Sequence, residues 1–319
     1  MGTKILELLQ TGKEVAWGTA VAATAKLMGY TDFTMRPVTD VHQPEERGRL
    51  GPSPLAALVG QAAEGNMTLE ATYEDLPFIF DSIFAVATPT GADPYTYAYT
   101  APYTAVPTIR ENTFEFGQSG GEYKLAGGVL TGLTITGETK GVWTVAAPVI
   151  GKQVSTVTLA SLNDRTVELI RFADTVLYID AWGGTIGTTA ITSAFIRFEL
   201  AVETGRHLKF FDTSVLPGLY GHGKFTGTLK LLLEWNAAVK AYLDSLITPA
   251  LVQKQIRIKA TSGTHMATID FAGVLAEAPE MFQDREGNEV VELSLNGQYN
   301  PTLGNWCKTE VVNGVATLP

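Results

Sequence analysis

Four kinds of residue in this sequence could support chemistry: a glycine-rich stretch with a lysine, four histidines, paired carboxylates and one cysteine. The glycine-rich stretch Gly218-x-x-x-x-Gly223-Lys224 has the spacing of a phosphate-binding loop. That motif continues with Ser or Thr, which binds magnesium, and then with a helix. Here Phe225 follows, and the next residues alternate as in a strand. The stretch therefore favours a flexible glycine-rich loop over a nucleotide site.

The histidines and the cysteine do not form a recognisable site. None of the histidines has the spacing of metal ligands. His207 and His222 share one predicted loop, so a weak metal site there is the alternative to two ordinary loop histidines. Cys307 is the only cysteine, so no intrachain disulfide can form. Its one basic neighbour, Lys308, does not clearly activate the thiol.

The paired carboxylates could in principle serve acid–base catalysis. Glu45-Glu46 lies in a charged stretch and is better explained as a solvated surface. Glu74-Asp75 precedes an apolar stripe with helical spacing, where a helix dipole favours negative charge. Because no catalytic constellation emerges, we predict that the protein is not an enzyme and has neither a cofactor nor a metal site.

A strand followed by a helix occurs twice, at residues 65–84 and 227–247. In each copy apolar residues first alternate and then recur at i, i+3, i+4 and i+7, the spacings of a half-buried strand and an amphipathic helix. Asp75 and Asn236 are the predicted N-caps. The first copy has Met67, Leu69, Ala71 and Tyr73, then Leu76, Ile79, Phe80 and Ile83; the second has Leu229, Leu231, Leu233 and Trp235, then Val239, Tyr242, Leu243 and Leu246.

The match between the two copies continues downstream. Gly128-Val129-Leu130 recurs as Gly273-Val274-Leu275, and the pattern at 141–151 recurs 146 positions later. These matches predict an internal duplication. We therefore expect a mainly β fold (β-rich α+β) with two tandem β-sandwich or barrel domains, residues 1–152 and 153–319, each with one flanking α-helix.

Two long connections and one insert interrupt this pattern. The connections are predicted at residues 40–64 and 205–226, at the same place in each half. The insert, residues 88–107, is rich in Tyr and Pro, and its side chains Tyr95, Tyr97, Tyr99 and Tyr103 suit either a carbohydrate or protein contact or a flap over the protein's own sheet.

Charge and hydropathy exclude several classes of protein. The 319 residues carry a formal net charge of −10, which argues against a surface that grips DNA phosphates. An acidic surface would instead let DNA pass without adhering. The sequence 1–14 lacks the apolar core of a signal peptide, and no run approaches the length of a membrane helix, so we predict no membrane partner.

Two segments resemble the phage tail tube protein (major tail protein) of long, non-contractile tails. GKEVAWGTAVAATAKLMGYTDFTMRPVTD (Gly12 to Asp40) is similar to that family's opening, a polar arm with a (W/Y)GTA.AA segment leading into a strand. EERGRLGPSPLAALVGQAAEGNMTLEATYEDLPFIFDSIF (Glu45 to Phe84) is similar to its long loop and its G..TLE strand before a short helix. The resemblance is strongest over residues 12–84, extends to about 150, and depends on the internal repeat for the second half.

This resemblance implies a structural virion protein that self-assembles. Six tail-tube domains form a ring around a lumen, so a duplicated chain would close as a trimer, a pseudo-hexamer, and the rings would stack into the tube that conducts DNA into the host. The implied partners are other copies of the chain, tape-measure and tail-terminator proteins, and phage DNA that passes without specific binding. The implied location is the phage tail, after synthesis in the host cytoplasm.

The resemblance also suggests which residues make contacts between rings. The two long connections correspond to the family's stacking loop, and the inter-ring candidates are Glu45, Glu46, Arg47, Arg49, Leu55, Leu58, Val59, Arg206 and Lys209. Glu111 and Glu115 are the candidates for the lumen. The alternative is a β-sandwich binding module for a carbohydrate or a receptor on a virion or cell surface, which would use the Tyr-rich insert.

Overall fold

The computed structural model describes residues 4–45, 47–237, 239–240, 251–277, 279–280 and 283–318. Strands dominate this part of the chain, and α1 (Leu76–Ile83) is the only α-helix with complete bounds in it; η1 (Lys4–Leu6) and η2 (Phe172–Asp174) are single 3-10 turns. The strands are β1 (Leu8–Lys13), β2 (Ala25–Lys26), β3 (Tyr30–His42), β4 (Ala57–Glu70), β5 (Thr90–Gly91), β6 (Tyr95–Thr100), β7 (Asn112–Gln118), β8 (Gly121–Leu130), β9 (Gly132–Glu138), β10 (Thr144–Gly151), β11 (Gln153–Thr156), β12 (Thr175–Ala181), β13 (Ala190–Ile191), β14 (Phe195–Glu203), β15 (His207–Lys209), β16 (Leu219–Gly221), β17 (Thr226–Glu234), β18 (Gln253–Ser262), β19 (His265–Leu275), β20 (Gln283–Arg285), β21 (Asn288–Gly297) and β22 (Cys307–Asn313).

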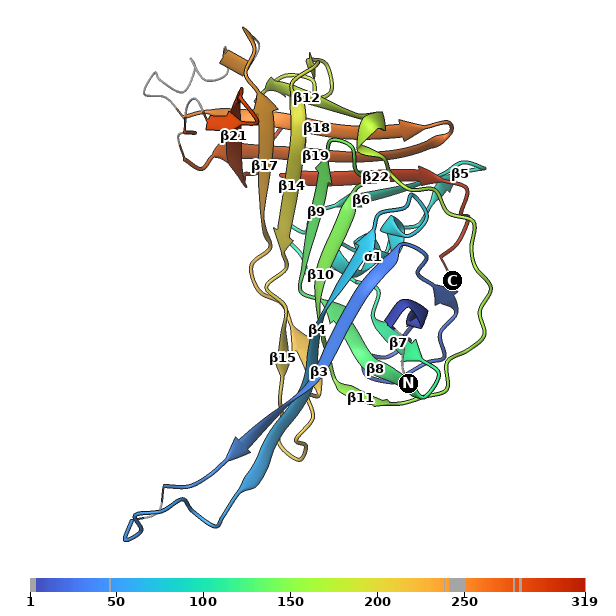
Figure 1. Ribbon diagram of the computed structural model, residues 1–319, viewed down its shortest axis with the longest axis vertical. Helices are drawn as coiled ribbons and strands as arrows, with labels where there is room; N and C mark the ends of the chain where they lie inside the picture. Colours follow the sequence, from blue (N-terminus) through green and yellow to red (C-terminus); the bar gives the residue numbers. More distant parts are fainter. Residues whose placement is uncertain are drawn as a thin grey trace.

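Twenty of these strands form one antiparallel hydrogen-bonded network, and β15 and β16 form a separate pair. We use the name central sheet for the run β3-β4-β10-β9-β14-β17-β21, with β20 paired to β21. Its strands run along the long axis of the molecule, whereas β18, β19 and β22 of the second half cross that direction (Figure 1). The mainly β prediction is therefore confirmed.

The two halves of the chain pair their strands in the same order. β3 pairs with β4, and β4 pairs with β10, as β14 pairs with β17 and β17 with β21. The register shift between Tyr30 and Asp32 in β3 has a counterpart between Phe195 and Arg197 in β14. Outside the central sheet, β7–β8 corresponds in the same way to β18–β19.

Strand registers correct one detail of the predicted match between the copies. Phe33 faces Met67 in the first half and Phe198 faces Leu231 in the second, so Met67 corresponds to Leu231 and not to Leu229. A slip of two residues keeps every side chain on its face of the sheet, so alternation alone does not detect it. The downstream match needs no correction, because Leu130 faces Val149 as Leu275 faces Leu295.

The helix α1 is buried on all sides, including the predicted apolar stripe. Asp75 stands at its N-cap position but makes no side-chain capping bond. The Asp75 carboxylate instead accepts hydrogen bonds from the backbone N–H groups of Met28 (3.0 Å) and Gly29 (3.2 Å) and pairs with Arg165. The predicted side-chain cap is therefore wrong, because the Asp75 carboxylate bonds to the chain before β3 and to Arg165 and not to the helix.

The second predicted helix is seen only at its start. Asn236 Oδ1 accepts a hydrogen bond from the Val239 backbone N–H (2.9 Å), which is the N-cap geometry that the sequence predicts. Residues 237, 239 and 240 are helical, and residues 241–250, with most of the predicted stripe, lie outside the described residues.

Strands fill much of the segments that the sequence predicts as connections. Residues 40–42 and 57–64 belong to β3 and β4, so the first connection is a long hairpin with its loop at 43–56. The second, residues 205–226, contains the hairpin β15–β16. The sequence did not predict these strands, because they lack the alternation of a strand with one buried face.

The insert contains β6, which pairs with β22 and so extends a sheet of the second half with a strand from the first. Tyr97 and Tyr99 on β6 are buried, whereas Tyr103 is exposed. The Tyr99 hydroxyl lies 3.0 Å from Asp81 Oδ1 and 3.2 Å from the Pro77 carbonyl oxygen, inside the core beneath α1. Two of the four tyrosines are thus internal, Tyr95 is partly exposed, and Tyr103 alone is fully at the surface.

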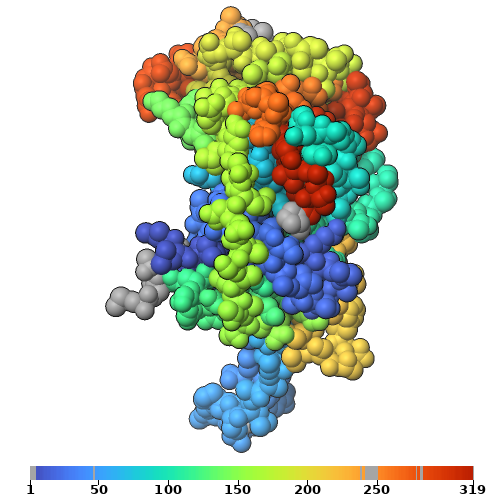
Figure 2. All heavy atoms as spheres, turned by 90° about the vertical axis from the view of Figure 1, so that its right-hand side faces the viewer, coloured from blue at the N-terminus to red at the C-terminus, as the bar shows by residue number. Residues whose placement is uncertain are grey.

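A segment at residues 157–168 joins the halves along one face of the molecule, where it forms a yellow-green band (Figure 2). Its Ala160 carbonyl accepts a hydrogen bond from Gln10 Nε2 (2.8 Å), and its Asp164 pairs with Lys26 (Nζ to Oδ1, 2.5 Å). On its N-terminal side, β11 pairs with β8 of the first half. One contiguous hydrophobic core contains residues of both halves.

Replacing Tyr99 with Phe removes the buried hydroxyl and leaves the Asp81 carboxylate with one donor fewer. Burial already raises the pKa of Asp81, so a lost donor is costly there. We expect the free energy of unfolding to fall by about 1–2 kcal/mol in urea denaturation. Tyr103→Phe, at an exposed position, is the control; an equal loss in both variants would contradict this account.

Candidate assembly surfaces

The hairpin β3–β4 projects from the body as an arm, which we define as residues 38–62 (Figure 1). Glu45, Arg47 and Arg49 lie exposed in its loop, and Glu46 lies outside the described residues. Leu55, Leu58 and Val59 are also exposed, with 58%, 46% and 55% of their surface accessible. Apolar side chains this exposed on a projecting hairpin are typical of a surface that another protein covers.

The arm carries two further exposed apolar residues that the sequence analysis missed, Val41 and Leu50. Their signal in the sequence is weak, because single apolar residues in a polar loop are common. The arm therefore presents more apolar surface than the predicted residues alone.

The second connection, residues 205–226, forms a shorter hairpin beside the arm. The Gln61 backbone N–H donates to the Val215 carbonyl oxygen (2.7 Å), which joins the two. Lys209 is exposed there, as are Phe210 and Phe211, which the sequence analysis also missed. Two adjacent phenylalanines within a polar, glycine-rich loop were the available signal.

Arg206, the remaining inter-ring candidate, is buried and has a structural role. Its guanidinium donates to the carbonyl oxygens of Ser82 (2.7 Å), Ile83 (2.7 Å) and Leu130 (2.8 Å). Desolvation lowers the pKa of Arg206 to about 10. A long charged side chain in a loop suggests exposure, but here the free carbonyls at the end of α1 lie within its reach.

The two lumen candidates do not lie on an open strand face. Glu115 is buried on β7, where its carboxylate accepts a hydrogen bond from the Ala23 backbone N–H (3.3 Å). Glu111 precedes β7 and accepts a hydrogen bond from the Tyr220 hydroxyl (2.9 Å). The burial of Glu115 argues against a position facing a lumen.

One face of the central sheet packs on the core, and the other, which we call the open face, is partly exposed along every strand. Alternation along the strands assigns the side chains to the two faces. The open face is rich in Thr and in charged residues. We leave out the arm, and so count β3 only up to residue 36 and β4 only from residue 64. On the seven strands, the charged side chains of the open face are then Asp32, Arg36, Glu64, Glu70, Glu138, Arg197, Glu199, Glu203, Lys230, Glu234 and Glu292.

Each of the three cations on the open face pairs with a carboxylate on the same face. Arg36 pairs with Glu64 directly opposite it, and Lys230 pairs with Glu199 (Nζ to Oε1, 3.3 Å). Arg197 reaches across β17 to Glu292 (Nη2 to Oε2, 3.7 Å). The remaining carboxylates leave the face with an excess of negative charge.

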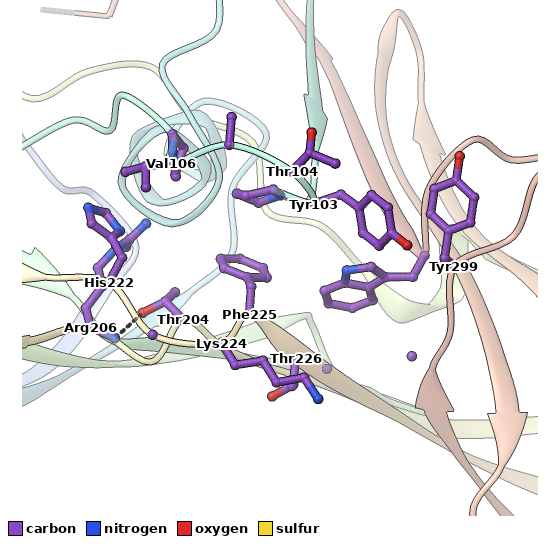
Figure 3. Close-up of a pocket in the computed structure, with 17 residues that line it drawn as sticks. Tyr103, Thr104, Val106, Thr204, Arg206, His222, Lys224, Phe225, Thr226 and Tyr299 are labelled. Atoms are coloured by element: carbon purple, nitrogen blue, oxygen red, sulfur yellow. Dashed lines mark hydrogen bonds between the residues drawn. The ribbon is translucent and has the colours of Figure 1, made fainter.

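A cavity of about 480 Å³ lies between the insert and the second half (Figure 3). Tyr103 and Tyr299 stack at its edge with ring centroids 4.5 Å apart, and Phe225, Lys224 and His222 also line it. Of the tyrosines predicted as a contact surface, Tyr103 alone lines this cavity. A binding-module function would therefore depend on other aromatic side chains than the sequence suggests, with Phe225, Tyr299 and Trp306 beside Tyr103.

Across the described ranges, no cluster of three or more potential metal ligands is found. Within the same ranges, no helix combines the length and apolar character needed to cross a bilayer.

These surfaces belong to a β-rich structural subunit with exposed apolar hairpins and sheet edges. The chain matches the profile of the phage tail tube protein family over residues 7–298, and it therefore belongs to this family. It is a structural, non-enzymatic component of the phage tail, and proteins of this family self-assemble into tubes. No curated protein matches the chain significantly.

Replacing Arg206 with Met leaves three buried carbonyl groups without their donor. We expect the free energy of unfolding to fall by roughly 3 kcal/mol, measured by urea denaturation. Lys209→Met removes a charge from the same loop at an exposed position and should change stability by less than about 0.5 kcal/mol. A stability loss of the same size in both variants would show that the loop's charge matters and the buried bonds do not.

Proposed function

We propose that three copies of this chain close into a ring and that the rings stack into a tail tube. In this proposal each chain contributes two similar domains, which arose by duplication, so that the ring is a pseudo-hexamer. The observation that carries the proposal is the repeated pairing order of the two halves, including the register shift at the same place in β3 and β14. Chance resemblance in strand alternation would not reproduce a bulge at an equivalent position.

The exposed apolar side chains of the two hairpins support stacking. The arm and the hairpin at 205–226 lie side by side and project from one end of the molecule (Figure 1). Their exposed residues would be covered by the next ring, which removes apolar surface from water. Glu45, Arg47, Arg49 and Lys209 would then meet charges on that ring.

The open face of the central sheet supports the role of conduit. If the central sheets close around a lumen, the open face lines it, and the excess carboxylates repel DNA phosphates. The three ion pairs add a second effect, because a cation held by a carboxylate is a weaker phosphate ligand than a free one. DNA could then move along the tube without adhering.

The finer functional assignments follow from the resemblance to major tail proteins. We propose a long, non-contractile tail and assembly alongside tape-measure and tail-terminator proteins. These partners would meet the same ring surfaces that stack on other copies of the chain.

Purified protein should form rings and hollow tubes in negative-stain electron microscopy, and isolated rings should contain three chains of 34.2 kDa by native mass spectrometry. A variant with residues 43–56 replaced by a two-residue turn should form rings but few tubes, because it lacks the arm's loop. Compact monomers at all concentrations, with or without other tail components, would overturn the ring proposal.

The charge effect can be tested in assembled tubes. The triple variant Glu64→Gln, Glu199→Gln, Glu292→Gln frees the three cations of the open face, and its tubes should bind a short DNA duplex at least about ten times more tightly than wild type in co-sedimentation at low salt. Higher salt should weaken this binding steeply.

The matched control is Glu70→Gln, Glu203→Gln, Glu234→Gln, which removes the same number of charges from the same face. Among the described residues, none of these three carboxylates holds a cation. Equal DNA binding by both triple variants would show that net charge alone governs adhesion.

A further inference from the structure

The cavity beside the insert is lined by basic residues in a protein that is acidic as a whole. Its charged or titratable side chains, besides tyrosines, are Arg206, His222 and Lys224, and the described residues that line it include no Asp or Glu. The chain carries a formal net charge of −10. None of the charged residues of the open face lines this cavity, so it is separate from the face proposed to line the conduit.

Two parts of the chain that are distant in sequence enclose the cavity. Residues 102–107 of the insert form one side, and the chain around the ends of β14, β16, β17 and β21 forms the other. A volume of about 480 Å³ is in the range of small-molecule sites in proteins. The cavity is therefore large enough for a small ligand with a polar and an apolar end.

Buried and basic groups give one end of the cavity a positive character. Arg206 is 6% exposed, and its Nε–H has no hydrogen-bond partner among the described residues. A buried donor without a partner costs free energy, which an acceptor atom of a ligand would recover. Burial lowers the pKa of His222, and the nearby charges of Arg206 and Lys209 lower it further, so an anion is favoured here.

The glycine-rich stretch supplies backbone donors to the same cavity. Gly223 and Lys224 are exposed between β16 and β17, and their backbone N–H groups make no hydrogen bond within the described residues. Neighbouring backbone N–H groups of this kind bind phosphate oxygens. A Cβ atom at position 223 would lie 2.6 Å from the Gly205 carbonyl oxygen, so this close approach requires glycine.

The stretch differs from a nucleotide-hydrolysing phosphate loop in two ways. β17 follows it in place of a helix, and Phe225 stands where that motif has the Ser or Thr that binds magnesium. A phosphate held here would therefore be bound by backbone and basic groups without a metal ion.

Aromatic side chains form the opposite end of the cavity. His222 and Arg206 lie at one side of the group in Figure 3, Tyr103 and Tyr299 lie at the other, and Phe225 stands between them. Tyr103 and Tyr299 stack with their ring centroids 4.5 Å apart. Flat aromatic surfaces of this kind stack on nucleobases.

We infer that the cavity binds a nucleoside monophosphate. Its phosphate lies against the Gly223–Lys224 backbone and His222, and its base lies against the aromatic end. The combination of an anion site with an aromatic site, within one cavity, selects this ligand over a plain sugar or a free anion. The inference goes beyond the proposed function and does not depend on a ring, because every group comes from a single chain.

The test is isothermal titration calorimetry of the purified protein with AMP. We expect one AMP bound per chain, with the same affinity in EDTA as in magnesium. The affinity for AMP should exceed those for adenosine and for inorganic phosphate by at least about tenfold each, because either probe contacts only one end of the cavity.

The phosphate end is tested by the double variant His222→Gln, Lys224→Gln, in which the affinity for AMP should fall by about tenfold or more. The matched control is His207→Gln, Lys209→Gln, which changes the same residue types in the same hairpin outside the cavity and should bind within about twofold of wild type. Urea denaturation shows whether both variants remain folded.

The aromatic end is tested by Tyr103→Ala, which should weaken AMP by about tenfold and leave the affinity for inorganic phosphate unchanged. Tyr103→Phe keeps the ring and should retain AMP binding.

Several results would overturn this inference. Absence of AMP binding at millimolar concentration, or equal affinities for AMP and adenosine, would exclude the phosphate contact. Equal affinities for AMP and inorganic phosphate would show a plain anion site without a base contact. Loss of binding in EDTA would contradict a site that works without metal. Rings and tubes in micrographs test the proposed function alone, so either result can stand without the other.

Discussion

The pairing of strand edges is the constraint on which this structure depends. An antiparallel strand satisfies its backbone hydrogen bonds only if each edge finds a partner or faces water. Inside the chain, β9 and β14 satisfy each other and make the two halves one sheet. At the outer limits of the same sheet, β3 pairs only with β4 and β20 only with β21 among the residues that the structure describes. An unpaired strand edge of this kind can accept a strand from another chain.

Buried polar groups hold the two halves in a fixed relation around α1. Arg206 from the second half donates to the carbonyls at the end of the helix, and Asp81 within the helix is bonded by Tyr99 of the insert. Buried polar groups of this kind tolerate little displacement. Leaving one of them without a hydrogen-bond partner costs more free energy of folding than its hydrogen bond contributes. The insert strand β6 adds a further connection by pairing with β22. The result is one hydrophobic core across the boundary between the halves.

Charge is distributed differently on the two kinds of surface. The arm combines charged residues with exposed apolar side chains, a mixture suited to contact with another protein. On the open face, threonines and ion-paired charges predominate, with carboxylates in excess. Among the described residues of these strands, each cation on the open face is held by a carboxylate, which makes it a weaker ligand for phosphate.

Local patterns in the sequence predicted the strands with one buried face, the helix α1 and the family resemblance, whereas the duplication that they suggest stays a prediction. Alternation and helical spacing depend on nearest neighbours, and so Met67 to Ile83 could be assigned without the structure. Only the tertiary structure decided the two-residue shift between the copies, the burial of Arg206 and Glu115, and the extension of the arm as paired strands. Each of these depends on contacts between residues far apart in the chain, and the local pattern of side chains is the same whether or not those contacts form.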